Sequence, residues 1–105
     1  MTDKELLTYA AKAAGYEVFW DGENNRFLKW YSPNYDEWNP LNDDGQAFRL
    51  AIDAYIDAHT QIGDHQVYAQ AESNNVKQLN RINGDKYAAL RKCITQAAAE
   101  IGKGM

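Results

Sequence analysis

The sequence predicts an α+β fold in one compact domain, residues 1–105, with a small antiparallel sheet packed against helices in the order α-β-β-α-β-β-α. Three observations support this prediction. The chain has 105 residues, enough for one hydrophobic core. Apolar residues make up 45% of it and charged residues 25%, as in ordinary globular proteins. Segments with apolar residues at helical spacing alternate with pairs of short segments typical of β-strands.

The first helix is expected between Thr2 and Gly15. Thr2 and Glu5 have the spacing of a capping box, in which each side chain bonds the backbone of the other residue. Apolar residues follow Leu6 at i+4 and i+7, which indicates one buried helix face. Gly15 is expected to adopt the left-handed conformation that ends the helix.

Residues 16–31 are expected to form a β-hairpin. Apolar residues alternate with others from Tyr16 to Trp20, and an Asp-Gly and an Asn-Asn pair then supply turn residues. The loop is expected to have five residues or a bulged shorter form. Residues 32–45 follow with two prolines, each of which removes a backbone hydrogen-bond donor. We therefore predict a loop there and not a strand.

The central helix is predicted from about Asp44 to His59. Apolar residues recur there at helical spacing, so one stripe of the helix is expected to face the core. Asp43 or Asp44 is expected to cap its first turn, and Gly63 is the expected stop after it. The stripe consists of Phe48, Ala51, Ile52, Tyr55 and Ile56.

A second hairpin and a last helix complete the predicted fold. The stretches "HQVYAQAES" and "NNVKQLNRING" predict a hairpin that turns at residues 73–75, with a bulge in its second strand or a second strand that is partly irregular. Asn83 or Asp85 is expected to cap the last helix, and Gly102 is expected to end it.

Acidic residues cluster just before the central helix. Asp36, Glu37, Asp43 and Asp44 fall within nine residues, and clustered carboxylates can hold a hard cation such as Mg²⁺. Their spacing is not that of an EF-hand loop, however, and helix capping accounts for Asp43 and Asp44. We therefore predict no metal site and no cofactor. The alternative is a small metal-dependent hydrolase or nucleotide-processing enzyme that uses Asp43, Asp44 and a histidine.

The other residues with reactive side chains have structural explanations. His59 and His65 lack any zinc-binding spacing, and His59 is explained by the dipole at the end of the central helix. Cys93 is the only cysteine, which excludes an intramolecular disulfide, and a buried, inert thiol is expected there. The sequence therefore favours binding over catalysis.

Aromatic residues gather between the first hairpin and the central helix. An exposed aromatic ring carries a large contact area at a low entropy cost, so such rings are enriched in binding sites. The same rings can instead cover the open face of the hairpin, and both interpretations stay open, above all for Trp38. The candidate binding residues are Trp30, Tyr31, Tyr35, Asp36, Glu37 and Trp38.

The net charge of −4 limits the classes of partner. A chain without an excess of basic residues does not have the charge that the nucleic-acid backbone requires, so direct nucleic-acid binding is not expected. No apolar run approaches the length of about 20 residues that a membrane helix needs, and the start "MTDKELL" is not a signal peptide. We expect a cytoplasmic protein. A homo-oligomer and an acidic mimic of DNA stay open.

Three segments resemble a known group of proteins. They are "MTDKELLTYAAKAAGY", "WNPLNDDGQAFRLAI" and "YAALRKCITQAAAEIGKGM", and together they cover about half of the chain. They resemble small proteins encoded in tailed-phage and prophage genomes of enterobacteria and their relatives, with a central W-N-P-L-x-D-D-G-x-A-x-R-L-A signature. The resemblance implies a phage origin and a place inside the bacterial host cell, without a reaction or catalytic residues. We expect an accessory protein that binds a host protein or a nucleotide-like small molecule.

Overall fold

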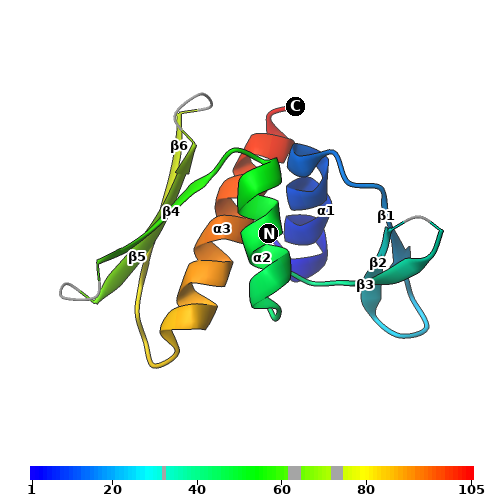
Figure 1. Cartoon of the computed structure of the whole chain (residues 1–105), viewed down its shortest axis with the longest axis horizontal. Coiled ribbons are helices and arrows are strands. Elements are labelled where there is room, and N and C mark those ends of the chain that lie inside the picture. Colours follow the sequence, from blue (N-terminus) through cyan, green and yellow to red (C-terminus); the bar gives the residue numbers. More distant parts are fainter. Residues whose placement is uncertain (32, 62–64, 72–74) are drawn as a thin grey trace.

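The computed structural model describes residues 1–31, 33–61, 65–71 and 75–105. Within these residues, three helices form a central layer between two three-stranded antiparallel sheets (Figure 1). The predicted α+β class is confirmed, but the order is α-β-β-β-α-β-β-β-α because each predicted hairpin gains a third strand. The elements are α1 (Asp3–Ala14), β1 (Val18–Asp21), β2 (Arg26–Trp30), β3 (Tyr35–Trp38), α2 (Asp44–Asp53), β4 (Asp57–Gln61), β5 (Gln66–Ala71), β6 (Val76–Arg81) and α3 (Lys86–Lys103).

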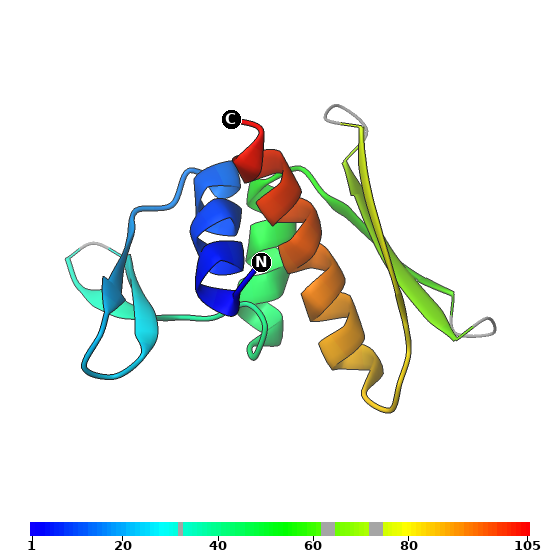
Figure 2. The same ribbon diagram turned by 180° about the vertical axis from the view of Figure 1, so that it is seen from behind.

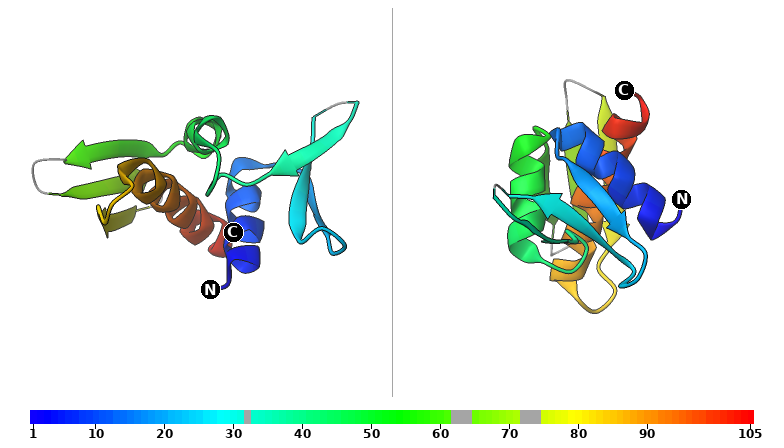
Figure 3. Two further views of the ribbon diagram at one scale, coloured as in Figure 1. Left: turned by 90° about the horizontal axis from the view of Figure 1, so that it is seen from below. Right: turned by 90° about the vertical axis from the view of Figure 1, so that its right-hand side faces the viewer.

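The layers follow one another along the longest dimension of the molecule, whose extents are 42 × 30 × 24 Å. The view from below in Figure 3 shows the second sheet (β4–β6), the helices and then the first sheet (β1–β3). Figure 2 shows from behind how α1 and α3 pack side by side. The first and last helices therefore form the centre of the fold.

Helix α1 begins and ends as predicted. The Thr2 hydroxyl accepts a hydrogen bond from the Glu5 backbone N–H at 3.2 Å, and the Glu5 carboxylate accepts one from the Thr2 backbone N–H at 3.3 Å. The capping box is therefore formed. Gly15 has a φ of 75°, and its N–H donates to the Lys12 carbonyl, which closes the last turn.

The first sheet is a meander in the order β1-β2-β3. The predicted first hairpin is confirmed, and its loop consists of residues 22–25 because Asp21 pairs with Arg26. Trp20, Phe27 and Trp38 lie opposite one another on the three strands and form the inner face of the sheet, which packs against α1.

The prediction that residues 32–45 form only a loop is wrong, because β3 lies within them. Pro33 and Pro40 both fall outside the strand, so neither removes a hydrogen bond from its ladder with β2. β3 is also an edge strand, so its backbone groups pair with a neighbouring strand, β2, on one side only.

Helix α2 is shorter than predicted. Asp43 caps it as expected, since its carboxylate accepts a hydrogen bond from the Gln46 backbone N–H at 2.8 Å. The helix ends at Asp53 because Tyr55 adopts the left-handed conformation, with a φ of 58°, and turns the chain into β4. His59 therefore lies in β4, and its predicted place at a helix end is wrong. Gly63, the predicted stop, lies outside the described residues.

The second sheet is a meander in the order β4-β5-β6. The predicted second hairpin is β5-β6, whereas most of its predicted turn, residues 73–75, lies outside the described residues. The prediction of a bulge or of a partly irregular second strand is wrong, because β5 and β6 pair in continuous register. Val76 and Leu79 lie on opposite faces of β6, so their spacing does not require an extra residue.

Helix α3 begins as predicted but does not end at Gly102. The Asp85 carboxylate caps it by accepting hydrogen bonds from the backbone N–H groups of Tyr87 and Ala88 at 2.9 and 3.1 Å. The helix continues to Lys103, and Gly102 lies against α1. A Cβ atom at this position would lie 1.8 Å from the Tyr9 carbonyl oxygen, so only glycine permits this approach of the two helices.

The core lies between the helices and the inner faces of both sheets, and Leu50, Val67 and Cys93 are among its fully buried residues. None of the helices that the structure describes is both long and apolar enough to cross a membrane.

Candidate functional site

Trp38 belongs to the core and not to a binding surface. Its side chain is 1% exposed, and its ring meets that of Tyr16 edge-on, with the centroids 5.8 Å apart. It lies on the inner face of β3 opposite Phe27, where the first sheet covers α1. Of the two interpretations of Trp38, the core position is therefore correct and the surface anchor is wrong.

Two other predicted anchors, Trp30 and Tyr35, do lie together on the outer face of the first sheet. Their ring centroids are 5.0 Å apart, and the ring centroid of Phe19, which is not among the predicted binding residues, lies 4.7 Å from that of Tyr35. These rings are 38% to 45% exposed. The register places Glu37 on the same face. The cluster is a surface feature, and its role in binding stays a prediction.

Tyr31 and Asp36 lie on the other side of the first sheet. The Lys29 ammonium is 4.0 Å from the ring centroid of Tyr31 and 4.4 Å from that of Tyr16, which allows two cation–π contacts. Asp36 lies opposite Lys29 in the register of β2 and β3. The six predicted binding residues are therefore divided between two faces and the core.

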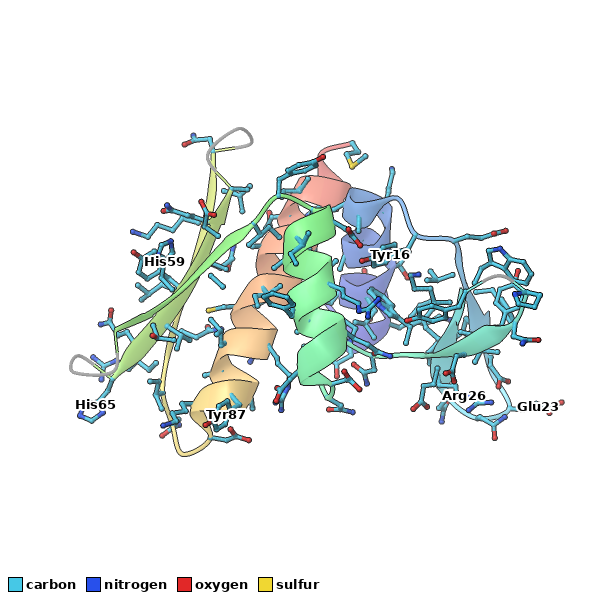
Figure 4. The ribbon with its side chains drawn as sticks, in the orientation of Figure 1. Tyr16, Glu23, Arg26, His59, His65 and Tyr87 are labelled. Carbon is cyan, nitrogen blue, oxygen red and sulfur yellow. The ribbon has the colours of Figure 1, made fainter. Side chains whose placement is uncertain are left out.

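Tyr16 connects the start of the first sheet to α2. Its hydroxyl donates a hydrogen bond to the Asp53 carboxylate, and Figure 4 shows the side chain between the two elements. Burial raises the pKa of Tyr16 well above its ordinary value, and the hydrogen bond and negative charge of Asp53 raise it further. The phenol therefore stays protonated and serves as a structural donor.

The paired aspartates at the start of α2 have structural partners. Asp43 caps the helix, and Asp44 accepts a hydrogen bond from the Arg91 guanidinium on α3 at 2.6 Å. His59 and His65 both lie away from this end of α2 (Figure 4). In the described ranges, no group of three or more His, Cys, Asp or Glu side chains is placed to hold a metal ion. The constellation that the alternative hydrolase needs is not assembled.

Cys93 is buried, as predicted. Its exposed fraction is 0%, and its Sγ lies 3.4 Å from the Val67 carbonyl oxygen in the second sheet. Burial raises the pKa of the thiol, and only the thiolate is a good nucleophile. The residue therefore belongs to the contact between α3 and the second sheet.

An apolar groove lies between α2, α3 and β4. Its volume is about 470 Å³, within the range of about 300–1,000 Å³ that is typical of binding sites. Figure 4 shows Tyr87 at its lower end, in the first turn of α3. The main apolar side chains along the groove are Phe48, Ile52, Ile56, Tyr87, Leu90 and Ile94.

Helix α2 supplies the most exposed wall of the groove. The helix has two adjacent apolar stripes, and the other helices cover the one that contains Ala47 and Leu50, which are at most 2% exposed. Phe48 and Ile52 lie on the second stripe and are 66% and 56% exposed, and Tyr55 is 83% exposed. The prediction that these three residues face the core is therefore wrong. A contiguous apolar surface of this kind marks an interaction site in many soluble proteins.

The charged groups of the groove lie near its ends. The Arg91 guanidinium binds Asp44 and also donates to the Leu41 carbonyl at 2.8 Å, which holds it in place. Asp57, at the start of β4, is exposed, and no ion pair to it is present among the described residues. The groove therefore combines apolar walls with two carboxylates, and Asp57 is the one without an ion-pair partner among the described residues.

One signal in the sequence could have revealed this site. Ala47, Leu50, Ala51 and Ala54 alone complete a core stripe with the spacing i, i+3, i+4 and i+7. The neighbouring stripe with Phe48 and Ile52 gives α2 more apolar surface than one buried face requires. The second apolar stripe of α2 therefore indicates a second contact surface.

No known protein family, no curated protein and no solved structure matches this chain.

Proposed function

We propose that this chain is a non-enzymatic binding protein that holds a partner protein in the groove between α2, α3 and β4. The observation that carries the proposal is the exposure of Phe48 and Ile52 beside other apolar walls. Removal of apolar surface from water contributes about 25 cal/mol per Å², which opposes the entropy cost of association. Large side chains around a pocket supply most of the binding energy in typical interfaces.

The charges of the groove support a protein partner over a nucleotide. Arg91 is the cation among the lining residues that the structure describes, and Asp44 already holds it. A phosphate group would therefore meet the carboxylate of Asp57 without a free cation nearby. Apolar side chains of a protein fit these walls better.

The setting of this binding event is part of the same proposal. The resemblance of three segments to phage and prophage proteins supports an accessory protein that acts on a host protein inside a bacterial cell. Groove binding and phage origin are independent, so either can fail without the other.

The experiment that tests the groove compares a variant in α2 with a variant just after it. Ile52→Lys places a charge in the groove, whereas Tyr55→Asn changes an exposed residue outside the lining, at a positive φ that asparagine tolerates. Each variant is used to capture proteins from the bacterial host, and a captured protein is then purified and titrated by calorimetry. We expect Ile52→Lys to weaken binding about tenfold or more, because it removes apolar contact and buries a charge.

The control has to retain the affinity of the wild type, and both variants have to keep the circular dichroism spectrum of the fold. Equal affinities of the wild type and Ile52→Lys for the purified partner would contradict the proposal. If Trp30→Ala alone abolished binding, the site would lie on the outer face of the first sheet.

A further inference from the structure

One wall of the groove is the free edge of a sheet. Among the strands that the structure describes, β4 pairs only with β5, so its other edge carries backbone N–H and C=O groups without a strand partner there. Figure 3 shows β4 as the strand of the second sheet nearest to α2. No hydrogen bond to this edge is present among the described residues. An open edge of this kind is a template for another strand.

The inner face of β4 is uncovered. Ala58 on β4 is exposed, whereas Ala69, directly opposite on β5, is 0% exposed. Likewise, Thr60 on β4 is exposed, whereas Val67, directly opposite on β5, is fully buried. The helices therefore cover this sheet only as far as β5, and the groove begins where their cover ends. Ala58 lines it.

The opposite edge of the same sheet is protected. β6 carries Lys77 and Arg81, both exposed, and charged side chains on an edge strand discourage the addition of another strand. β4 has a single charged residue, Asp57, at its first position. This carboxylate lies at the groove, where its negative charge favours a partner with a basic residue nearby.

We propose that the groove takes an extended segment of the partner protein, which adds as a strand to the free edge of β4. Every second side chain of such a strand points in the same direction as Ala58, into the groove. Large apolar residues at those positions contact α2 and α3, and a lysine or arginine lies near Asp57. This inference rests on the proposed function and specifies its partner segment.

Other occupants fit the observations less well. A helix in the groove would leave the backbone groups of β4 without partners. A second copy of this chain that paired through β4 would direct Ala58 and Thr60 into the groove, and these side chains are too small to fill about 470 Å³. An extended partner segment with large apolar residues pairs with the backbone groups of β4 and also fills the apolar groove.

The experiment selects random displayed peptides on the wild-type chain, with Ile52→Lys for counter-selection. We expect peptides with apolar residues at i, i+2 and i+4 and a basic residue beside them. A selected peptide should slow amide hydrogen exchange of alternate residues in β4 about tenfold or more, because strand pairing engages every second backbone N–H on that edge. N-methylation of alternate peptide bonds in the peptide should weaken binding about tenfold.

Two lysine variants test the edge itself. Ala58→Lys adds a charge to the exposed inner face of β4, and Leu79→Lys makes the matched change on the exposed outer face of β6. We expect the first to abolish peptide binding and the second to leave it unchanged, with both folds intact by circular dichroism. Retention of peptide affinity by Ala58→Lys would overturn the inference.

The remaining outcomes separate this inference from the proposed function. Selected peptides with helical spacing, bound in the groove without protection of β4, would overturn the added strand while groove binding stands. Failure to select any groove-dependent peptide would also overturn it. A dimer in sedimentation that Ala58→Lys dissociates would identify a second copy as the occupant. Groove binding itself fails only when Ile52→Lys leaves the affinity for the purified partner unchanged.

Discussion

The two sheets of this molecule share a meander topology and differ in how they reach the helices. The first sheet presents large rings on its inner face, in the row of Trp20, Phe27 and Trp38. The second sheet presents small side chains such as Val67 and Ala69, and the backbones of β5 and α3 approach closely. The first sheet therefore packs against the helices through a few large side chains, whereas the second sheet packs against them through many small ones.

This difference affects where the stability and the open surface of the molecule lie. In the first sheet, three rings form the row that faces α1, so we expect the loss of one ring to remove much of that contact. In the second sheet, the contact with α3 is distributed over β5 and β6. The inner face of β4, with Ala58 and Thr60, stays exposed. The three predictions below test this comparison.

The largest expected effect is that of Trp38→Ala. Removal of a fully buried ring from the first sheet should lower the free energy of unfolding by about 3–5 kcal/mol. Val67→Ala, the corresponding change in the second sheet, should cost about 1–3 kcal/mol, because the side chain is smaller. Urea unfolding followed by circular dichroism measures both values.

Phe19→Ala provides the control within the first sheet, since this ring is 45% exposed on the outer face. It should cost less than about 1.5 kcal/mol. Equal losses in Trp38→Ala and Val67→Ala would show that the two sheets do not differ in how their stability is distributed.

The next effect is that of Gly102→Ala, which acts on the helical layer that both sheets share. The added methyl group would lie 1.8 Å from the Tyr9 carbonyl oxygen, so α1 and α3 must move apart. We expect a loss of about 1–3 kcal/mol or more. Gly104→Ala is the matched control, because its Cβ would lie 3.6 Å from the nearest atom, the Ile101 carbonyl oxygen. If thermal unfolding could not distinguish these variants, the close helix contact would not be essential.

The smallest effect depends on pH and concerns the hydrogen bond of Tyr16, just before β1, to Asp53 at the end of α2. The pKa of Tyr16 is raised in the folded state, so the contribution of its protonated form is complete below about pH 10 and is lost as the pH rises above that value. Tyr16→Phe should cost about 0.5–1.5 kcal/mol at neutral pH and should make stability fall less steeply above pH 10. Parallel stability curves for the two proteins between pH 9 and pH 11 would be the opposite result.

Local signals in the sequence predicted the helix caps and the paired strands. Thr2, Glu5 and Asp85 act through neighbours in the chain, so their roles follow from spacing alone. The alternation in β5 likewise follows from one buried and one open face. Such features need no knowledge of the tertiary structure.

The third strand of each sheet could not be predicted in this way. β4 has the sequence DAHTQ, without a run of β-branched residues, and becomes a strand because β5 lies beside it. The site was missed for a related reason. The sequence shows two apolar stripes on α2, but the position of α3 decides which one is covered and leaves Phe48 and Ile52 exposed.

The contact between Gly102 and Tyr9 also has a consequence for synthesis. Helix α1 is made first, yet its main neighbour is α3, and 93 residues separate Lys12 from Met105, whose carbonyl accepts a hydrogen bond from the Lys12 ammonium. At about 5–20 residues per second, the ribosome needs about 5–20 s to cover that distance. During this interval the face of α1 that packs against α3 lacks this neighbour. The contact between α1 and α3 therefore forms only late in synthesis.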